Sequence, residues 1–172
     1  MTEHRADGSS MADVSGKAVT HRRALACGSI YLGEEAFLQV VENRLEKGDA
    51  LSLAEFAGIM AAKQTPALIP LCHPISLNRV AVHPVARPAT SAVEIFCYAE
   101  IAERTGVEME ALCGLSVALL TVWDLAKPVN PALRISGTRL LFKSGGKNGT
   151  WQHPDGLPAE ARQLLERYSE RK

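Results

Sequence analysis

Apolar and polar residues alternate along several stretches of the chain and recur with the helical period along others. Alternation every two residues is typical of a strand, and a period of 3.6 residues is typical of a helix. The patterns predict, in order, a strand over residues 18–32, helices over 34–45 and 49–62, strands over 77–85 and 92–104, a helix over 105–129 and a strand over 133–142. Without one of the first two helices, this order is the split βαβ arrangement of a ferredoxin-like α+β fold, an antiparallel sheet covered by helices. The other face of such a sheet needs a partner.

The helix predicted over residues 105–129 is apolar around most of its circumference. Thr105 and Glu108 have the spacing of a capping box at its start. Pro128 is expected to end the helix and to bias Lys127 away from helical angles. A helix that is apolar all round is buried on all sides. Because a short chain has few elements to cover it, we expect a second subunit to cover one face.

Asp124 and Lys127 lie in the last turn of that helix, three residues apart and therefore on one face. The helix dipole and burial would both disfavour the charge of Asp124, whereas Lys127 would favour it. A carboxyl group in this environment is suited to proton transfer. An isolated pair of this kind is more often a solvated ion pair. The apolar surroundings and the preceding Trp123 favour the functional interpretation.

Residues 65–77 contain three prolines, which exclude a helix or an interior strand. The segment is apolar and presents Cys72 and His73 between Pro70 and Pro74. A loop histidine is more often structural than functional, but the flanking prolines favour a placed ligand contact. A zinc site is disfavoured because two adjacent ligands lack tetrahedral spacing.

The last predicted strand leads into a basic, glycine-rich loop at residues 143–149. Glycines let backbone N–H groups approach an anion, so this loop is a candidate phosphate contact, although it lacks the complete P-loop pattern. The alternative is a mobile polar tail. We predict a disordered tail over residues 1–12, a single domain over 13–149, and a helical extension over 150–172 with its amphipathic part at 158–171.

The composition fits one globular domain of 172 residues, of which 47% are hydrophobic. The formal net charge is zero, which argues against nucleic-acid binding. The sequence shows neither a signal peptide nor, by inspection, an apolar run long enough to span a membrane. Cysteines at 27, 72, 97 and 113 are scattered, so we expect reduced thiols and a cytoplasmic location.

Six short motifs together resemble the cyclic pyranopterin monophosphate synthase family, the C protein of molybdenum cofactor biosynthesis. They are Lys-Gly-Asp at 47–49, Ala-Ala-Lys at 61–63, Leu-Ile-Pro-Leu-Cys-His-Pro at 68–74, Thr-Gly-Val-Glu-Met-Glu-Ala-Leu at 105–112, Asp-x-x-Lys at 124–127 and Lys-Ser-Gly-Gly-Lys at 143–147. The resemblance covers roughly residues 11–149. Leu25 departs from it, because a second basic residue often stands three positions after Arg22 in the family.

The resemblance implies a lyase that converts 3′,8-cyclo-7,8-dihydroguanosine triphosphate to cyclic pyranopterin monophosphate and pyrophosphate. It also implies a homohexamer, a trimer of dimers, with no tightly bound cofactor beyond Mg²⁺ that accompanies the triphosphate. By position, the catalytic residues are Asp124, Lys127 and Lys47, and the substrate contacts are Leu71, Cys72, His73, Glu108, Met109, Glu110, Lys63, Lys143 and Arg22.

Two other classes of function are compatible with the fold. A nucleotide- or RNA-binding ferredoxin-like module would carry exposed aromatic residues and a net basic charge, and neither is evident. An inactive scaffold of the same family would not need to retain Asp124, Lys127 and Lys47.

Helix geometry adds an expectation about the assembly. Glu110 and Asp124 are separated by about 21 Å along one helix and by about 40° around it. One bound ligand cannot touch both in the same chain. If both belong to one active site, as the resemblance implies, they come from two chains related by a two-fold axis with antiparallel helices.

Overall fold

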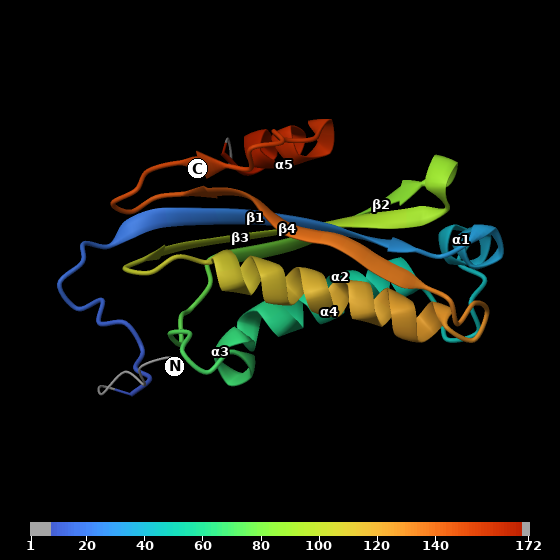
Figure 1. Cartoon of the computed structure of the whole chain (residues 1–172), viewed down its shortest axis with the longest axis horizontal. Coiled ribbons are helices and arrows are strands. Elements are labelled where there is room, and N and C mark those ends of the chain that lie inside the picture. Colours follow the sequence, from blue (N-terminus) through green and yellow to red (C-terminus); the bar gives the residue numbers. More distant parts are fainter. Residues whose placement is uncertain (1–7, 170–172) are drawn as a thin grey trace, which may run out of the picture.

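The computed structural model describes residues 8–169, which fold into one five-stranded antiparallel sheet with helices on both faces (Figure 1). In chain order the elements are β1 (Thr20–Tyr31), α1 (Glu34–Val41), α2 (Ala50–Lys63), α3 (Thr65–Leu68), β2 (Arg79–Arg87), a 3₁₀ turn η1 (Pro88–Thr90), β3 (Ala92–Glu103), α4 (Glu108–Ala126), β4 (Arg134–Ser144), β5 (Trp151–Gln152) and α5 (Ala159–Ser169). The predicted tail at residues 1–7 and the end of the extension at 170–172 lie outside the described residues. Residues 8–12 form neither helix nor strand.

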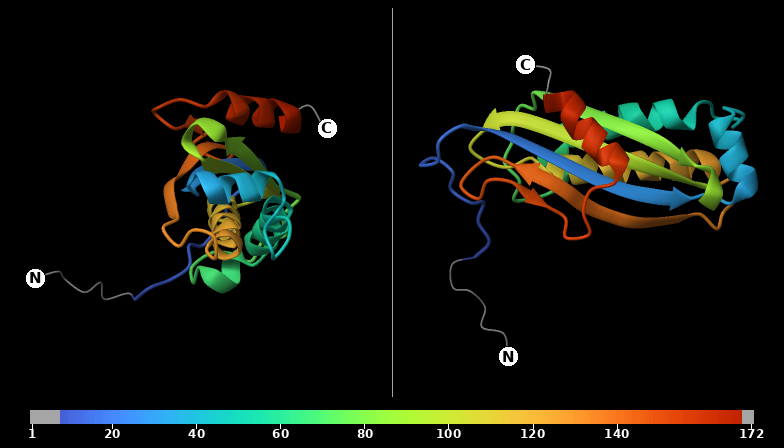
Figure 2. Two further views of the ribbon diagram at one scale, coloured as in Figure 1. Left: turned by 90° about the vertical axis from the view of Figure 1, so that its right-hand side faces the viewer. Right: turned by 90° about the horizontal axis from the view of Figure 1, so that it is seen from above.

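The strands are arranged in the order β2-β3-β1-β4-β5. The first four of these have the ferredoxin-like order, and β5 is a short addition at the β4 edge. α2 and α4 lie side by side on one face, so the molecule has a helix layer, a sheet layer and the single helix α5 on the far side (Figure 2). The predicted fold class is confirmed.

Small residues let α2 and α4 pack closely. A Cβ added at Gly58 would lie 2.8 Å from the carbonyl oxygen of Gly114, which is closer than carbon and oxygen tolerate. The start of α2 agrees with the helix predicted over 49–62, and the Asp49 carboxylate caps it by accepting hydrogen bonds from the backbone N–H groups of Leu51 and Ser52, each at 3.1 Å.

Both predicted ends of α4 need correction. The helix begins at Glu108 after Val107, without a side-chain cap, so the capping box of Thr105 and Glu108 does not form. The Glu108 carboxylate instead accepts a hydrogen bond from Lys143 at 3.0 Å. At the other end, Lys127 keeps helical angles because its N–H still bonds the Trp123 carbonyl at 2.9 Å. The effect of a following proline is a bias, and this backbone bond outweighs it.

In the single chain α4 is buried on some sides only, and the second subunit expected to cover the remaining face stays a prediction. Its buried residues face α2 and the sheet, whereas Leu120 is 56% exposed and Met109 37% exposed. The helix is long and apolar enough to cross a membrane by length and composition, contrary to the sequence expectation, but 56% of that window is buried in the fold. A core helix gives the same signal.

Two local predictions also change. Residues Thr65–Leu68 form a one-turn helix, α3, because Pro66 occupies a first-turn position, where a missing N–H costs nothing. The β2–β3 connection is tighter than expected: β2 continues to Arg87, and the turn closes through Ser91 at a φ of 46°.

The C-terminal extension covers the sheet face opposite α2 and α4 (Figure 1). Ala161 and Leu164 of α5 pack on a second small core. Its strand residues are Leu25, Cys27, Phe96, Tyr98, Leu141 and Phe142. This explains Leu25, which is completely buried under α5 where the family often has a basic residue. The helix predicted at 158–171 is confirmed over its described part, and β5 was not predicted.

Candidate active site

The predicted site residues gather at the two ends of α4. At its C-terminal end, Asp124 meets two lysines from different parts of the chain. Lys127 Nζ lies 2.7 Å from Asp124 Oδ1, and Lys47 Nζ lies 3.0 Å from Oδ2. Lys47 comes from the turn before α2, which Gly48 makes at a φ of 102°. The three residues assigned to catalysis by resemblance are therefore in direct contact.

The electrostatics of Asp124 differ from the expectation. Its side chain is 51% exposed rather than buried. Hydrogen bonds from Lys127 and then Lys47 lower the pKa of its carboxyl group below the ordinary value. Asp124 is therefore ionised at neutral pH, with both oxygens held by ammonium groups. Such a carboxylate is a proton acceptor rather than a donor.

The second cluster surrounds a pocket of about 430 Å³ at the N-terminal end of α4. The proline-flanked loop forms one wall, and the first turn of α4 forms the other. The lining residues are Ala12, Leu71, Cys72, His73, Ile75, Thr105, Gly106, Glu108, Met109 and Glu110. All six substrate contacts predicted from the two long motifs, at 71–73 and 108–110, are among them.

Burial raises the pKa of two acidic groups in this pocket. Glu110 is only 3% exposed, and burial, reinforced by the charge of Glu108, raises the pKa of its carboxyl group. Burial is also the main cause that raises the pKa of the Cys72 thiol, with a further contribution from Glu110. Cys72 therefore stays a protonated thiol at neutral pH and is a hydrogen-bonding wall residue rather than a nucleophile.

His73 is oriented by the N-terminal segment. Its Nε2 lies 2.8 Å from the carbonyl oxygen of Ala12. A carbonyl oxygen only accepts, so Nε2 carries a proton in this contact. The pocket is thus closed on one side by residues that precede the first strand.

Lys143 reaches the same end of α4 from β4. Its Nζ bonds Glu108 Oε1 at 3.0 Å, and both side chains are partly exposed. A Cβ at Gly106 would collide with the Glu108 carboxylate, so the glycine lets this carboxylate fold back against the chain. The Lys143–Glu108 ion pair therefore borders the pocket, where an anionic ligand can also bind the Lys143 ammonium group.

Arg22 has a structural task in this chain. Its Nε and Nη2 donate to the carbonyl oxygens of Glu103 and Arg104 at 2.9 and 3.0 Å. Side chains at Gly145 and Gly146 would collide with His21 and Arg22, so the glycine-rich loop packs closely on the start of β1. The loop predicted as a phosphate wrap is thereby tied to the strand next to Lys143.

Like Arg22, Lys63 does not line the pocket at the start of α4. It lines a separate pocket of about 460 Å³ with Arg79 and the residues leading into β2. Ile75 lines both this pocket and the first one. The two pockets are therefore neighbours that meet at Ile75.

Some pocket residues were not assigned from the sequence. Thr105 and Gly106 were taken only as the start of the helix, although they directly precede Glu108 and line the pocket. Ala12 and Ile75 carry no chemical signal, and only the fold could identify them. Among residues 8–169, no three His, Cys, Asp or Glu side chains gather in a way that could hold a metal ion.

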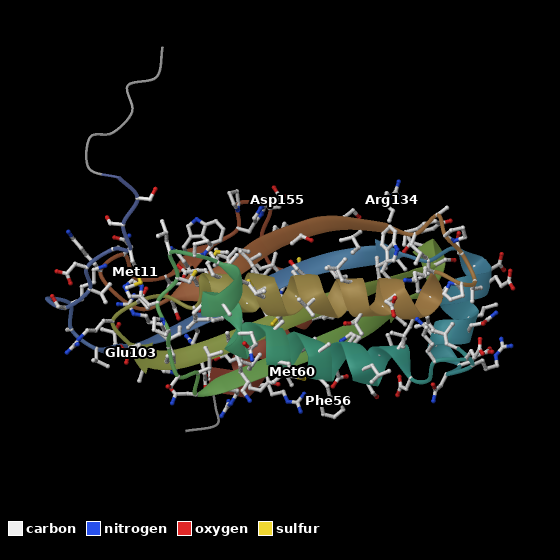
Figure 3. All side chains as sticks on the ribbon, turned by 90° about the horizontal axis from the view of Figure 1, so that it is seen from below. Met11, Phe56, Met60, Glu103, Arg134 and Asp155 are labelled. Carbon is white, nitrogen blue, oxygen red and sulfur yellow. The ribbon has the colours of Figure 1, made fainter. Side chains whose placement is uncertain are left out.

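The two clusters are at opposite ends of α4, so one chain does not unite them. Along the helix they are about 21 Å apart. The outer side of the helix layer is apolar and exposed, and Figure 3 shows Phe56 and Met60 at its rim. Its exposed members are Leu53, Phe56, Met60, Leu68, Leu71, Met109 and Leu120.

Comparison with known proteins gives a consistent result. The model of the MoaC family matches residues 11–146. A cyclic pyranopterin monophosphate synthase of Rhodospirillum rubrum is 48% identical over 141 residues, which are 82% of this chain and 85% of that protein. Proteins of the same name from Cereibacter sphaeroides and Thermomicrobium roseum are 47% and 45% identical, over 83% and 88% of this chain and 89% and 92% of their own lengths.

Proposed function

Because this chain belongs to the MoaC family, we propose that it is a cyclic pyranopterin monophosphate synthase of molybdenum cofactor biosynthesis. The reaction is that of a lyase: 3′,8-cyclo-7,8-dihydroguanosine triphosphate gives cyclic pyranopterin monophosphate and pyrophosphate. The observation that carries this proposal is the contact of Asp124 with Lys47 and Lys127. A surface ion pair of Asp124 with a purely structural role would need only one of these two lysines.

Proton transfer is the task of the Asp124 cluster. Opening the purine-derived ring and closing the pterin ring both move protons between heteroatoms. Asp124 is held ionised and can accept a proton, and the ammonium groups of Lys47 and Lys127 can donate one. The same lysines can stabilise negative charge as the cyclic phosphate closes.

Substrate binding is the task of the pocket at the other end of α4. Glu110, buried and with a raised carboxyl pKa, and the Cys72 thiol can form hydrogen bonds to the base. Lys143 supplies donors for oxygen atoms, and neutral His73, whose Nε2–H donates to the Ala12 carbonyl, offers Nδ1 as an acceptor. Lys143 and Lys63 are assigned to the triphosphate, and Arg22 supports the loop beside it.

The active site requires both clusters, so we assign it to the interface of two chains in a homohexamer, a trimer of dimers. The exposed apolar side of α2, α3 and α4 supports this assignment. A two-fold axis across that face brings the start of one α4 to the end of the other. We place the enzyme in the cytoplasm, with neither nucleic acid nor membrane as partner, without a tightly bound cofactor, and with Mg²⁺ only as a companion of the triphosphate.

Turnover of the substrate is the decisive test. The full-length protein, incubated with the product of the preceding enzyme, should form a pterin that becomes fluorescent after oxidation. Lack of this product from a folded, assembled protein would refute the proposed function. RNA binding in the same preparation would instead favour the alternative of a binding module.

The phosphate assignment has its own test. Lys63→Ala and Lys143→Ala should each weaken the binding of substrate and of pyrophosphate together, because both ligands are polyanions. Titration calorimetry with inorganic pyrophosphate measures this effect directly. Unchanged affinity in both variants would show that these lysines do not form the phosphate site.

A further inference from the structure

The match to the family ends at residue 146, and the C-terminal extension that follows from residue 150 contacts the strand that carries Lys143. We propose that residues 150–169 are a positioning element for Lys143, acting through Arg23. This inference rests on the proposed function, since it assigns Lys143 to the phosphate groups. It gives the extension a specific effect on ligand affinity in addition to its contribution to the core.

The first contact is a backbone pairing. β5 adds to the free edge of β4, with Trp151 opposite Lys143 and Gln152 opposite Phe142. The N–H of His153 continues the pairing to the Leu141 carbonyl at 2.8 Å. The backbone of Lys143 is therefore flanked by β1 on one side and by the extension on the other.

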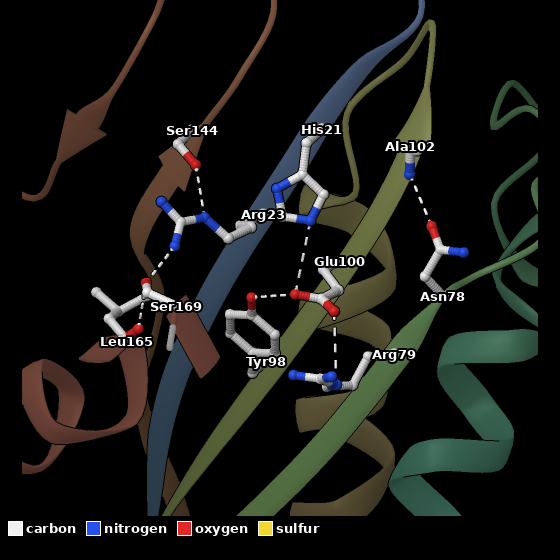
Figure 4. A network of polar contacts seen from close by, with 10 residues as sticks. All are labelled: His21, Arg23, Asn78, Arg79, Tyr98, Glu100, Ala102, Ser144, Leu165 and Ser169. Carbon is white, nitrogen blue, oxygen red and sulfur yellow. Dashed lines mark hydrogen bonds and ion pairs between the residues drawn. The ribbon is translucent and has the colours of Figure 1, made fainter. Parts of the chain in front are cut away.

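The second contact is made by Arg23. Its Nε donates to Ser144 Oγ at 3.1 Å, and its Nη1 donates to Ser169 Oγ at 2.6 Å, so one guanidinium joins α5 to the end of β4 (Figure 4). Arg23 also stacks 5.5 Å over the Phe142 ring. Successive strand residues point to opposite faces. The hydrogen bond from Arg23 therefore fixes Ser144, the residue next to Lys143. The Lys143 side chain lies on the opposite face, on the helix side, where its Nζ bonds Glu108.

This end of β4 needs such support. The pairing of β1 with β4 shifts register between Leu25 and Ala26 and again between Cys27 and Ser29. Directly after Ser144 the chain turns through Gly145 and Gly146, both at positive φ. Glycines leave a chain more conformational freedom than other residues, so a lysine beside them is costly to order on binding. The extension reduces that cost by fixing the strand beforehand.

α5 is docked independently of Arg23. Tyr168 stacks on Tyr98 with a centroid distance of 4.7 Å, and its hydroxyl lies 2.7 Å from His83 Nε2. At the other end of α5, Glu160 pairs with Arg87 at 2.6 Å. Loss of Arg23 therefore leaves the helix in place, and the effect on Lys143 can be separated from loss of the helix.

The experiment compares the pyrophosphate affinity of full-length variants by calorimetry. Arg23→Ala removes both hydrogen bonds and should weaken binding about three- to ten-fold. Ser169→Ala should cause a smaller loss in the same direction. Glu160→Gln, the matched control, weakens α5 docking at its far end and should lower the melting temperature without changing the affinity. Because Arg23 acts through Lys143, adding Arg23→Ala to Lys143→Ala should cause no further loss.

Each other outcome overturns the inference. Additive losses in the double variant would mean that Arg23 does not act through Lys143. Equal weakening by Glu160→Gln would mean that only general stability is involved. Should Arg23→Ala fail to fold, an unchanged affinity in Ser169→Ala is the refuting result. The turnover assay on the wild type tests the proposed function separately, since pyrophosphate binding is measured without turnover.

Discussion

Two inactive variants should complement each other if the active site is shared between chains. The perturbations are Glu110→Ala, at the start of α4, and Asp124→Asn, at its end. The pocket at Glu110 has a volume of about 430 Å³, which corresponds to a sphere about 9 Å across. Fourteen residues of helix span about 21 Å, so a ligand in that pocket does not reach Asp124 of the same chain.

The expected recovery follows from counting sites. In a two-fold dimer each site takes Glu110 from one chain and Asp124 from the other. A mixed dimer then has one intact site and one site with both substitutions. Random reassembly of equal amounts should make about one quarter of all sites intact. Each variant alone should be nearly inactive.

The assay is pterin formation after the two variants are dissociated, mixed and reassembled, with mixed assemblies verified by mass spectrometry. Wild-type protein treated in the same way sets the full value, and each variant reassembled alone sets the background. Mixed assemblies that regain no activity would place Glu110 and Asp124 in sites of a single chain. The interface model would then have to be abandoned.

Three further predictions concern single residues. Asp124→Asn and Lys127→Ala should each reduce turnover by about 10²–10⁴ while the protein stays folded, since each removes a proton-transfer group; near-normal activity of either would contradict the assignment. Glu110→Gln should raise the melting temperature at pH 7–8, because burial raises the pKa of the Glu110 carboxyl group and its ionisation therefore opposes folding as the pH rises. The difference in melting temperature from the wild type should shrink as the pH falls towards the ordinary Glu pKa of 4.5. A gain that persists at low pH would contradict this cause. Gly58→Ala should destabilise the protein by about 1–3 kcal/mol in denaturant titration, because the added Cβ would lie 2.8 Å from a carbonyl oxygen of α4. The control is Gly16→Ala, whose added Cβ meets nothing within 4 Å. Equal effects of the two substitutions would refute the close-packing argument.

The buried Glu110 illustrates how function is placed in this fold. A carboxyl group at 3% exposure destabilises the chain once it ionises, yet the first turn of α4 presents it to the pocket. A variant that is both more stable and inactive would be consistent with its assignment to substrate binding. Selection for stability alone would not retain this residue.

Local sequence determined much of this structure. The residue pattern over 18–32 located β1, and the pattern over 49–62 located α2, which begins directly after Asp49. The prolines around Cys72 and His73 indicated a stiff segment that presents these side chains, and both line the pocket. These signals act over a few residues, where sterics and hydrogen bonding leave few alternatives.

The tertiary structure decided the contacts between distant residues. Lys47 meets Asp124 from 77 positions away, and Lys143 takes the Glu108 carboxylate that the local pattern assigned to a capping box. Leu25, which read as a missing basic residue, is instead covered by α5. Sheet register and helix packing bring such partners together. A side chain with two competing partners takes the one that the fold places nearest, and local sequence contains no measure of that distance.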